Sequence, residues 1–203
     1  MKKFTLSILL LASVVIAKAQ DVTYKPFKVD LALGYAIPGG TGSKGGVLFA
    51  LEPKYAVIPN VSVGLRMEAA VMARGQVNAN GQAADVDVKA AGSYLLTGDY
   101  YFTSTTVRPF AGLGLGIYSL ASASVSDANS TASVGGGSKF GEMVRAGAEI
   151  GHFRVGVEYN IVPKTKYEVV SSYQNGTAVK SQVSSKNGYI GIKLGFFIGG
   201  GKN

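Results

Sequence analysis

Residues 27–37 read FKVDLALGYAI, in which large apolar residues alternate with polar or small ones. Successive side chains of a β-strand point to opposite sides, so the large residues share one face of an extended chain. Lys28 and Asp30 fall on the other face, among alanine and glycine. The stretch therefore predicts a two-faced β-strand.

The same alternation recurs along the chain. It predicts seven further strands, at residues 47–57, 61–74, 86–102, 109–119, 140–150, 153–161 and 189–198. Beyond the N-terminal segment no apolar run reaches the 18 residues of a transmembrane helix.

Charged residues separate by face in these eight segments. Only Glu142 lies on the apolar face. Fourteen charges on the polar face form the candidate charge network, namely Lys28, Asp30, Glu52, Lys54, Arg66, Glu68, Asp87, Lys89, Asp99, Arg145, Glu149, Arg154, Glu158 and Lys193; Arg74 is the fifteenth. Either the apolar face packs in a protein core, as in a soluble sandwich or lipocalin-like barrel, or it faces lipid around a polar lumen.

Three features favour lipid. Long connections (38–46, 75–85, 120–139, 162–188) alternate with short ones (58–60, 103–108, 151–152), as in transmembrane barrels. Aromatic residues of the apolar face gather beside the short connections and predict a periplasmic girdle of Phe27, Tyr55, Tyr100, Phe102, Phe153 and Phe196. Glycines on the polar face, such as Gly112 and Gly114, leave room for long charged side chains in a narrow lumen. We therefore expect an all-β, eight-stranded antiparallel up-and-down transmembrane β-barrel.

The N-terminus has the pattern of a secretory signal peptide. Lys2 and Lys3 precede the apolar run Phe4–Ala17, and Ala17-Lys18-Ala19 supplies small residues for cleavage. We expect residues 1–19 to be removed and residues 20–203 to form one barrel domain.

Composition excludes several classes of site. The 203 residues contain no Cys, which rules out disulfides, thiolate metal ligands and a cysteine nucleophile, and the single His152 rules out a histidine metal cluster. No metal or other cofactor is expected. The formal net charge of +8 comes from scattered Lys and Arg in an exported chain, so nucleic acid is not an expected partner.

Four stretches resemble a known family. LEPKYAV (51–57), GDYYF (98–102), RPFAGLGLG (108–116) and YIGIKLGFF (189–197) are similar to the small bacterial outer membrane β-barrel family of the OmpX and OmpA membrane-domain type. The resemblance implies a place in the bacterial outer membrane, with outer membrane lipids, lipopolysaccharide and the barrel assembly machinery as partners. It also marks two departures: the chain ends Gly199 to Asn203 rather than on an aromatic residue, and no peptidoglycan-binding domain follows the barrel.

Local signals refine the expected connections. Pro53 cannot donate to a strand ladder and predicts a bulge or frayed pairing. Residues 120–139, rich in Ser, Ala and Gly, predict a flexible loop. Asn175-Gly176 predicts a hairpin with a type I′ turn, which either extends the last two barrel strands beyond the membrane or adds two spanning strands to make ten.

The expected function is structural or interactive. A side-chain-filled eight-stranded barrel would present extracellular loops and a protruding hairpin at 166–184 to a protein partner. The alternative is a narrow porin for ions or small solutes. An enzyme is not expected: the resembling barrel enzymes use a His near the outer rim, whereas His152 follows Gly151 in a short periplasmic connection, and the interior acids alternate with bases.

Overall fold

A computed structural model describes residues 25–39, 44–77, 83–120, 123–127, 130–134, 137–174 and 177–200 of the chain. Within these ranges it describes only the backbone of residues 73–77, 83–90, 123–127, 130–134, 166–174 and 177–185. The predicted signal peptide and the Asn175-Gly176 turn lie outside the described residues. No helix in the described part is long and apolar enough to cross a membrane.

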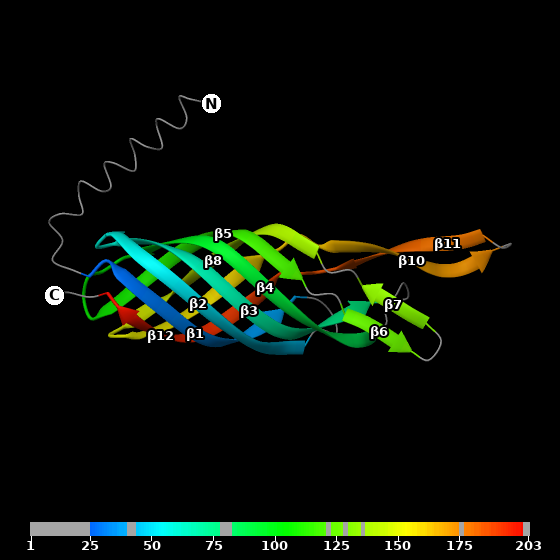
Figure 1. Ribbon diagram of the computed structural model, residues 1–203, viewed down its shortest axis with the longest axis horizontal. Helices are drawn as coiled ribbons and strands as arrows, with labels where there is room; N and C mark the ends of the chain where they lie inside the picture. The colour runs from blue at the N-terminus through cyan, green and yellow to red at the C-terminus, as the bar shows by residue number, and fades with distance from the viewer. Residues whose placement is uncertain are drawn as a thin grey trace, which may run out of the picture.

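Eight antiparallel strands close into one barrel, as Figure 1 shows. In chain order they are β1 (Phe27–Pro38), β2 (Lys44–Ile58), β3 (Val61–Val77), β4 (Ala83–Tyr101), β5 (Val107–Leu120), β8 (Gly137–Ile150), β9 (Phe153–Ile161) and β12 (Tyr189–Gly199). The first and last strands close the wall in continuous register from Lys28↔Gly199 to Pro38↔Tyr189. The predicted eight-stranded antiparallel barrel is confirmed.

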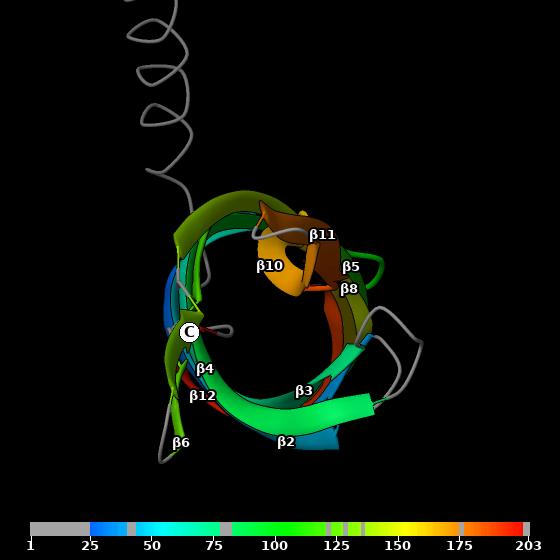
Figure 2. The same cartoon turned by 90° about the vertical axis from the view of Figure 1, so that its right-hand side faces the viewer.

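Two hairpins extend from one end of the barrel (Figure 1). β10 (Thr165–Gln174) pairs only with β11 (Thr177–Ser185), so the alternative of ten barrel strands is wrong. β6 (Ala123–Asp127) pairs with β7 (Ser130–Val134), so the predicted flexible loop at 120–139 contains a two-stranded hairpin that the sequence analysis did not predict. Figure 2 shows the two hairpins at different places around the barrel mouth. We call this the hairpin end and the opposite one the short-turn end.

The barrel is apolar outside and polar inside. Leu33, Leu113 and Leu194 are 66–70% exposed on the outer surface, whereas Lys54 and Arg66 are 1–2% exposed in the lumen. The reading as a soluble sandwich or lipocalin-like barrel is therefore wrong, because the apolar face surrounds the molecule instead of filling a core. A continuous apolar exterior of this kind requires lipid around it. Glu142, the one charge on this face, is exposed there as well.

Of the two irregularities predicted at Pro53, a bulge or frayed pairing, the structure has the frayed pairing. Pro53 pairs with Val29 of β1 in unbroken register, and on the β3 side the ladder omits Glu52 and Pro53 but resumes in the same register at Lys54↔Gly64. The missing N–H thus leaves a gap in one ladder and no shift. The irregularity of β2 near the short-turn end falls instead between Ala56 and Ile58.

Candidate functional site: the charged lumen

Inward-facing residues of all eight barrel strands meet along the lumen axis. Strand stagger brings together residues that are far apart in sequence, such as Arg145 of β8 and Glu52 of β2. Twelve of the fourteen predicted network residues have described side chains, and these form two groups. The other two, Asp87 and Lys89, have side chains outside the described residues, although the ladder places their backbone in β4 opposite Arg74 and Met72.

The larger group lies toward the short-turn end, and we call it the short-turn cluster. Its four bases and four acids are Lys28, Lys54, Arg145, Arg154, Asp30, Glu52, Asp99 and Glu149. The formal charges of these eight buried residues cancel. A fifth base, Arg108, lies at the edge of the cluster: its side chain is 27% exposed, and its Nη1 is 3.9 Å from Glu149 Oε2. An uncompensated charge in such a poorly hydrated interior would cost several kcal/mol, so the balance is a condition for the barrel to be stable.

Two basic residues hold the centre of the short-turn cluster. Arg145 donates from both terminal nitrogens to the Glu52 carboxylate, at 2.8 and 2.7 Å, and from Nε to Asp99 Oδ1 at 2.7 Å. Lys54 Nζ lies 2.8 Å from Asp99 Oδ2 and 2.8 Å from Asp30 Oδ2. Paired donors on a planar guanidinium fix geometry as well as charge, so Arg145 sets the relative position of β2, β4 and β8.

Aromatic side chains pack against this cluster inside the lumen. Tyr101 and Phe110 have ring centroids 5.9 Å apart, and Phe197 lies on the same side of the barrel. Lys28 Nζ stands 4.5 Å from the centroid of Phe197, and Arg154 lies 3.6 Å from that of Phe110. Lys28 also pairs with Glu149. Cations stacked on buried rings add attraction and exclude water from the short-turn end.

The second group, which we call the hairpin-side cluster, contains two bases and two acids. Arg66 Nη2 donates to both Glu68 and Glu158, and Lys193 pairs with the same two carboxylates. This cluster is also neutral. Tyr189 donates its hydroxyl to Glu68. Asn160 Nδ2 donates to Glu158 Oε1 at 3.1 Å, and Asn160 Oδ1 accepts from the Tyr118 hydroxyl at 2.7 Å.

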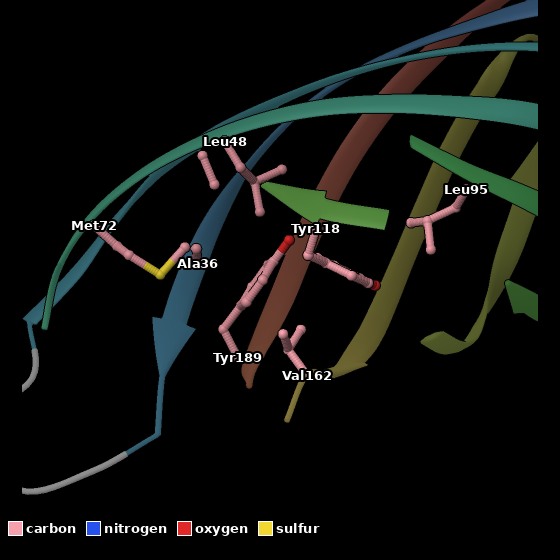
Figure 3. Packing of buried hydrophobic residues seen from close by; sticks show 8 residues of the cluster. Ala36, Leu48, Met72, Leu95, Tyr118, Val162 and Tyr189 are labelled. Carbon is pink, nitrogen blue, oxygen red and sulfur yellow. The ribbon is translucent and has the colours of Figure 1, made fainter. Parts of the chain in front are cut away.

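An apolar layer covers the hairpin-side cluster. Figure 3 shows its side chains converging from strands around the lumen. Its members are Ala36, Leu48, Ala70, Met72, Leu95, Tyr118, Val162 and Tyr189. Val162 belongs to the connection between β9 and β10, so the base of the long hairpin also closes the lumen at this end.

The six predicted girdle residues all lie on the exterior, 40–67% exposed. Phe27 pairs with Tyr55 across β1 and β2, and Phe153 pairs with Phe196 across β9 and β12. Their positions near the ends of β1, β2, β4, β9 and β12 put them in one belt at the short-turn end.

His152 lies in the turn between β8 and β9, where Gly151 adopts a positive φ of 60°. Its ring packs 5.4 Å from Phe197, and Nδ1 lies 3.1 Å from the Phe197 carbonyl oxygen. No carboxylate is among these partners. Within the described part of the chain, no group of three or more His, Asp and Glu side chains has an arrangement that could hold a metal ion.

Some residues of the site were not predicted. The inward aromatics Tyr101, Phe110, Tyr118, Tyr189 and Phe197 close the two ends of the lumen. The signal for them was present, because each is an aromatic residue at the parity of the charged face. Such residues interrupt a water-filled channel and are typical of a packed interior.

Solved outer membrane proteins share this fold. Neisserial surface protein A, from Neisseria, is 16% identical over 87% of this chain and 98% of its own, with a TM-score of 0.58. The outer membrane protein OprG of Pseudomonas aeruginosa is 13% identical over 86% of this chain and 96% of its own, with a TM-score of 0.56. No protein-family model and no curated protein sequence matches the chain. The fold and the apolar exterior are those of a transmembrane barrel of the bacterial outer membrane type, as the resemblance implied.

Proposed function

We propose that this protein is a non-conducting barrel of the bacterial outer membrane that serves a structural and interaction role through its extracellular end. The observation that supports the proposal is the filling of the lumen by buried side chains. Aromatic rings and the short-turn cluster occupy the end with short connections, and the hairpin-side cluster and the apolar layer occupy the end with hairpins.

The small cavity between the two clusters supports a plug. The cavity between the two clusters measures about 40 Å³. That volume admits only a few water molecules and no organic solute. An eight-stranded barrel is just wide enough for side chains to fill, and here glycine and alanine provide the space that the long charged side chains occupy.

The long hairpin supports the interaction role. In the described part of the chain β10 and β11 pair only with each other, so each keeps one edge free for a partner strand. At the base, Asn187 donates to the Pro163 carbonyl at 2.6 Å and to Thr165 Oγ1 at 2.8 Å. A clamped base holds the hairpin upright on the barrel, where a protein partner outside the cell could reach it. Outer membrane lipids and lipopolysaccharide would surround the wall, and the barrel assembly machinery would insert it.

Deletion of residues 166–184 tests this role. Intact cells that display the full chain should capture a surface partner in a pull-down. Cells that display the deletion variant should not capture it, although the barrel of that variant should still resist denaturation. Deletion of residues 123–134, which removes the β6 and β7 hairpin, is the matched control and should keep the partner. Equal capture by both deletions would contradict a role for the long hairpin.

The alternative function is a narrow porin. Liposomes containing the purified chain should keep their size in isotonic arabinose or glycine if the lumen is closed. Swelling at a rate that grows with protein content would favour the porin.

Processing and location belong to the same proposal. Support comes from the basic and apolar pattern of residues 1–19 and from the apolar exterior of the barrel. The protein recovered from outer membrane fractions should begin at Gln20. Recovery of an uncleaved chain, or of a soluble periplasmic protein that needs no detergent, would contradict it. The proposed role is not catalytic, and His152 lies at the end of the barrel away from the hairpins.

A further inference from the structure

The cavity of about 40 Å³ lies where the two ion-pair clusters meet. Asp30, Glu52, Arg145 and Arg154 of the short-turn cluster line one part of it, and Arg66, Glu158 and Lys193 of the hairpin-side cluster line another. The remaining lining comes mostly from alanine and glycine. The cavity is therefore a small space that charged side chains of both clusters border.

Arg66 brings unused donors to this space. Its side chain is 1% exposed, and Nη2 donates to both Glu68 and Glu158. Nε and Nη1 have no aligned acceptor in the protein. Buried guanidinium N–H groups without an aligned acceptor are costly, and a further acceptor beside them would relieve that cost.

Asp30 brings unused acceptors. It is 4% exposed and lies in ion-pair range of Lys54 and Arg154, at 2.8 and 3.4 Å. Those contacts balance its charge, but neither carboxylate oxygen accepts an aligned hydrogen bond. The cavity thus borders both a residue with N–H groups that could donate further hydrogen bonds and a residue with carboxylate oxygens that could accept them.

We propose that this cavity is a binding site for one to three ordered water molecules that connect Asp30 to Arg66. Water satisfies both residues because it donates and accepts. An anion would suit Arg66 but face the Asp30 carboxylate, and a cation would suit Asp30 but face Arg66. Because each cluster is already neutral, either ion would leave a net buried charge. A water molecule needs about 10–15 Å³ of such space, so the volume admits three at most.

The consequence is a hydrated point inside a closed barrel. The water joins the two clusters into one polar network, with the apolar layer on the hairpin side and the Phe110 ring in the cavity wall.

A crystal structure of the full mature barrel at 2 Å or better tests the site directly, with crystals grown in sodium bromide. The expected result is one to three solvent peaks in the cavity, hydrogen-bonded to the Asp30 carboxylate and to Arg66 Nε or Nη1, without anomalous signal. A cavity free of density, or an anomalous bromide peak in it, would overturn the proposal.

A matched pair of variants checks that the peaks belong to this cavity. Gly156→Ala adds a methyl group to the lining, 3.3 Å from the Ala146 carbonyl oxygen and 3.5 Å from the Phe110 ring. Gly98→Ala adds the same group where nothing lies within 4 Å. Gly156→Ala should remove at least one solvent peak, and Gly98→Ala should remove none.

A measurement in solution distinguishes water from an ion. At constant ionic strength and pH, exchanging chloride for gluconate, or sodium for potassium, should leave the Tm of the barrel unchanged. A rise in Tm specific to one of these ions, lost in Arg66→Met or Asp30→Asn, would identify an ion site and reject ordered water.

Discussion

Arg145 and Glu52 face each other across the lumen in a two-point ion pair, with Arg145 Nη1 2.8 Å from Glu52 Oε2 and Nη2 2.7 Å from Oε1. They are 93 positions apart in the sequence. The pair ties β8 to β2 through the interior, although these strands are not neighbours in the wall. The barrel is therefore stabilised by contacts across its lumen as well as by the ladders of its wall.

Removing this arginine should destabilise the barrel. Arg145→Ala leaves Glu52 and Asp99 in a low-dielectric interior with one fewer partner, and breaking a buried pair in this way costs about 3–5 kcal/mol. Urea unfolding in lipid vesicles, followed by heat-modifiable gel mobility, would measure the loss. Lys164→Ala is the control: it removes an exposed charge and should change stability by no more than about 0.5 kcal/mol. Equal effects of the two substitutions would contradict a structural network.

The hydroxyl of Tyr189 should matter more than that of Tyr159. Tyr189 is 2% exposed and donates to Glu68, whereas Tyr159 is 50% exposed on the outer wall. Tyr189→Phe removes a buried hydrogen bond to a charged group, worth about 1.5–3 kcal/mol. Tyr159→Phe should be close to neutral. Measurements of the free energy of unfolding compare the two variants. A larger loss of stability for Tyr159→Phe would mean that the inner and outer faces of the strands have been assigned the wrong way round.

A charge introduced on the outer wall should destabilise the barrel more, the deeper it lies in the membrane. Val157 is the middle residue of β9 and is 51% exposed, so Val157→Arg should cost about 2–4 kcal/mol. Ile58→Arg places the same charge at the short-turn rim, where the cost falls to about 0–1 kcal/mol. Equal tolerance of both substitutions in a detergent-free vesicle assay would mean that the wall does not face lipid.

The long hairpin should be cut from outside the cell. External trypsin on intact cells should cleave at Lys164, Lys166 or Lys180 and leave the eight-stranded barrel assembled, because a two-stranded ribbon beyond its clamped base is only marginally stable. Trypsin should not cleave at the buried Lys28 and Lys54 even after the outer membrane has been permeabilised. Cleavage at the hairpin only after permeabilisation would reverse the proposed orientation.

The strands of the wall could be predicted from the sequence because the alternation of apolar and polar residues repeats every two residues and depends on no distant part of the chain. Each face of FKVDLALGYAI is fixed by the alternation itself, so the exposed Leu33 and the buried Asp30 follow without knowledge of any neighbour. The same rule assigned Tyr55 and Phe196 to the exterior.

The arrangement within the lumen was not predictable, since it depends on strand stagger. Alternation places Arg66 and Arg145 on the inner face, but only the register shows that one joins Glu68 and Glu158 while the other joins Glu52 and Asp99. Nothing in the spacing indicates that each group is separately neutral.

The short hairpin was missed for a different reason. Its strands, Ala123–Asp127 and Ser130–Val134, consist mainly of Ser and Ala, which have weak strand propensity. Their pairing is held by the backbone ladder and by closeness to the barrel rim, neither of which a residue pattern records.

Current through single barrels in a planar lipid bilayer tests the plugged lumen most directly. Purified wild-type protein, inserted at a density verified by antibody and compared with a conducting porin in the same membrane, should show no steady current above the bare bilayer at neutral pH and 1 M KCl. Large, stable channels whose conductance grows with salt concentration would contradict the closed lumen.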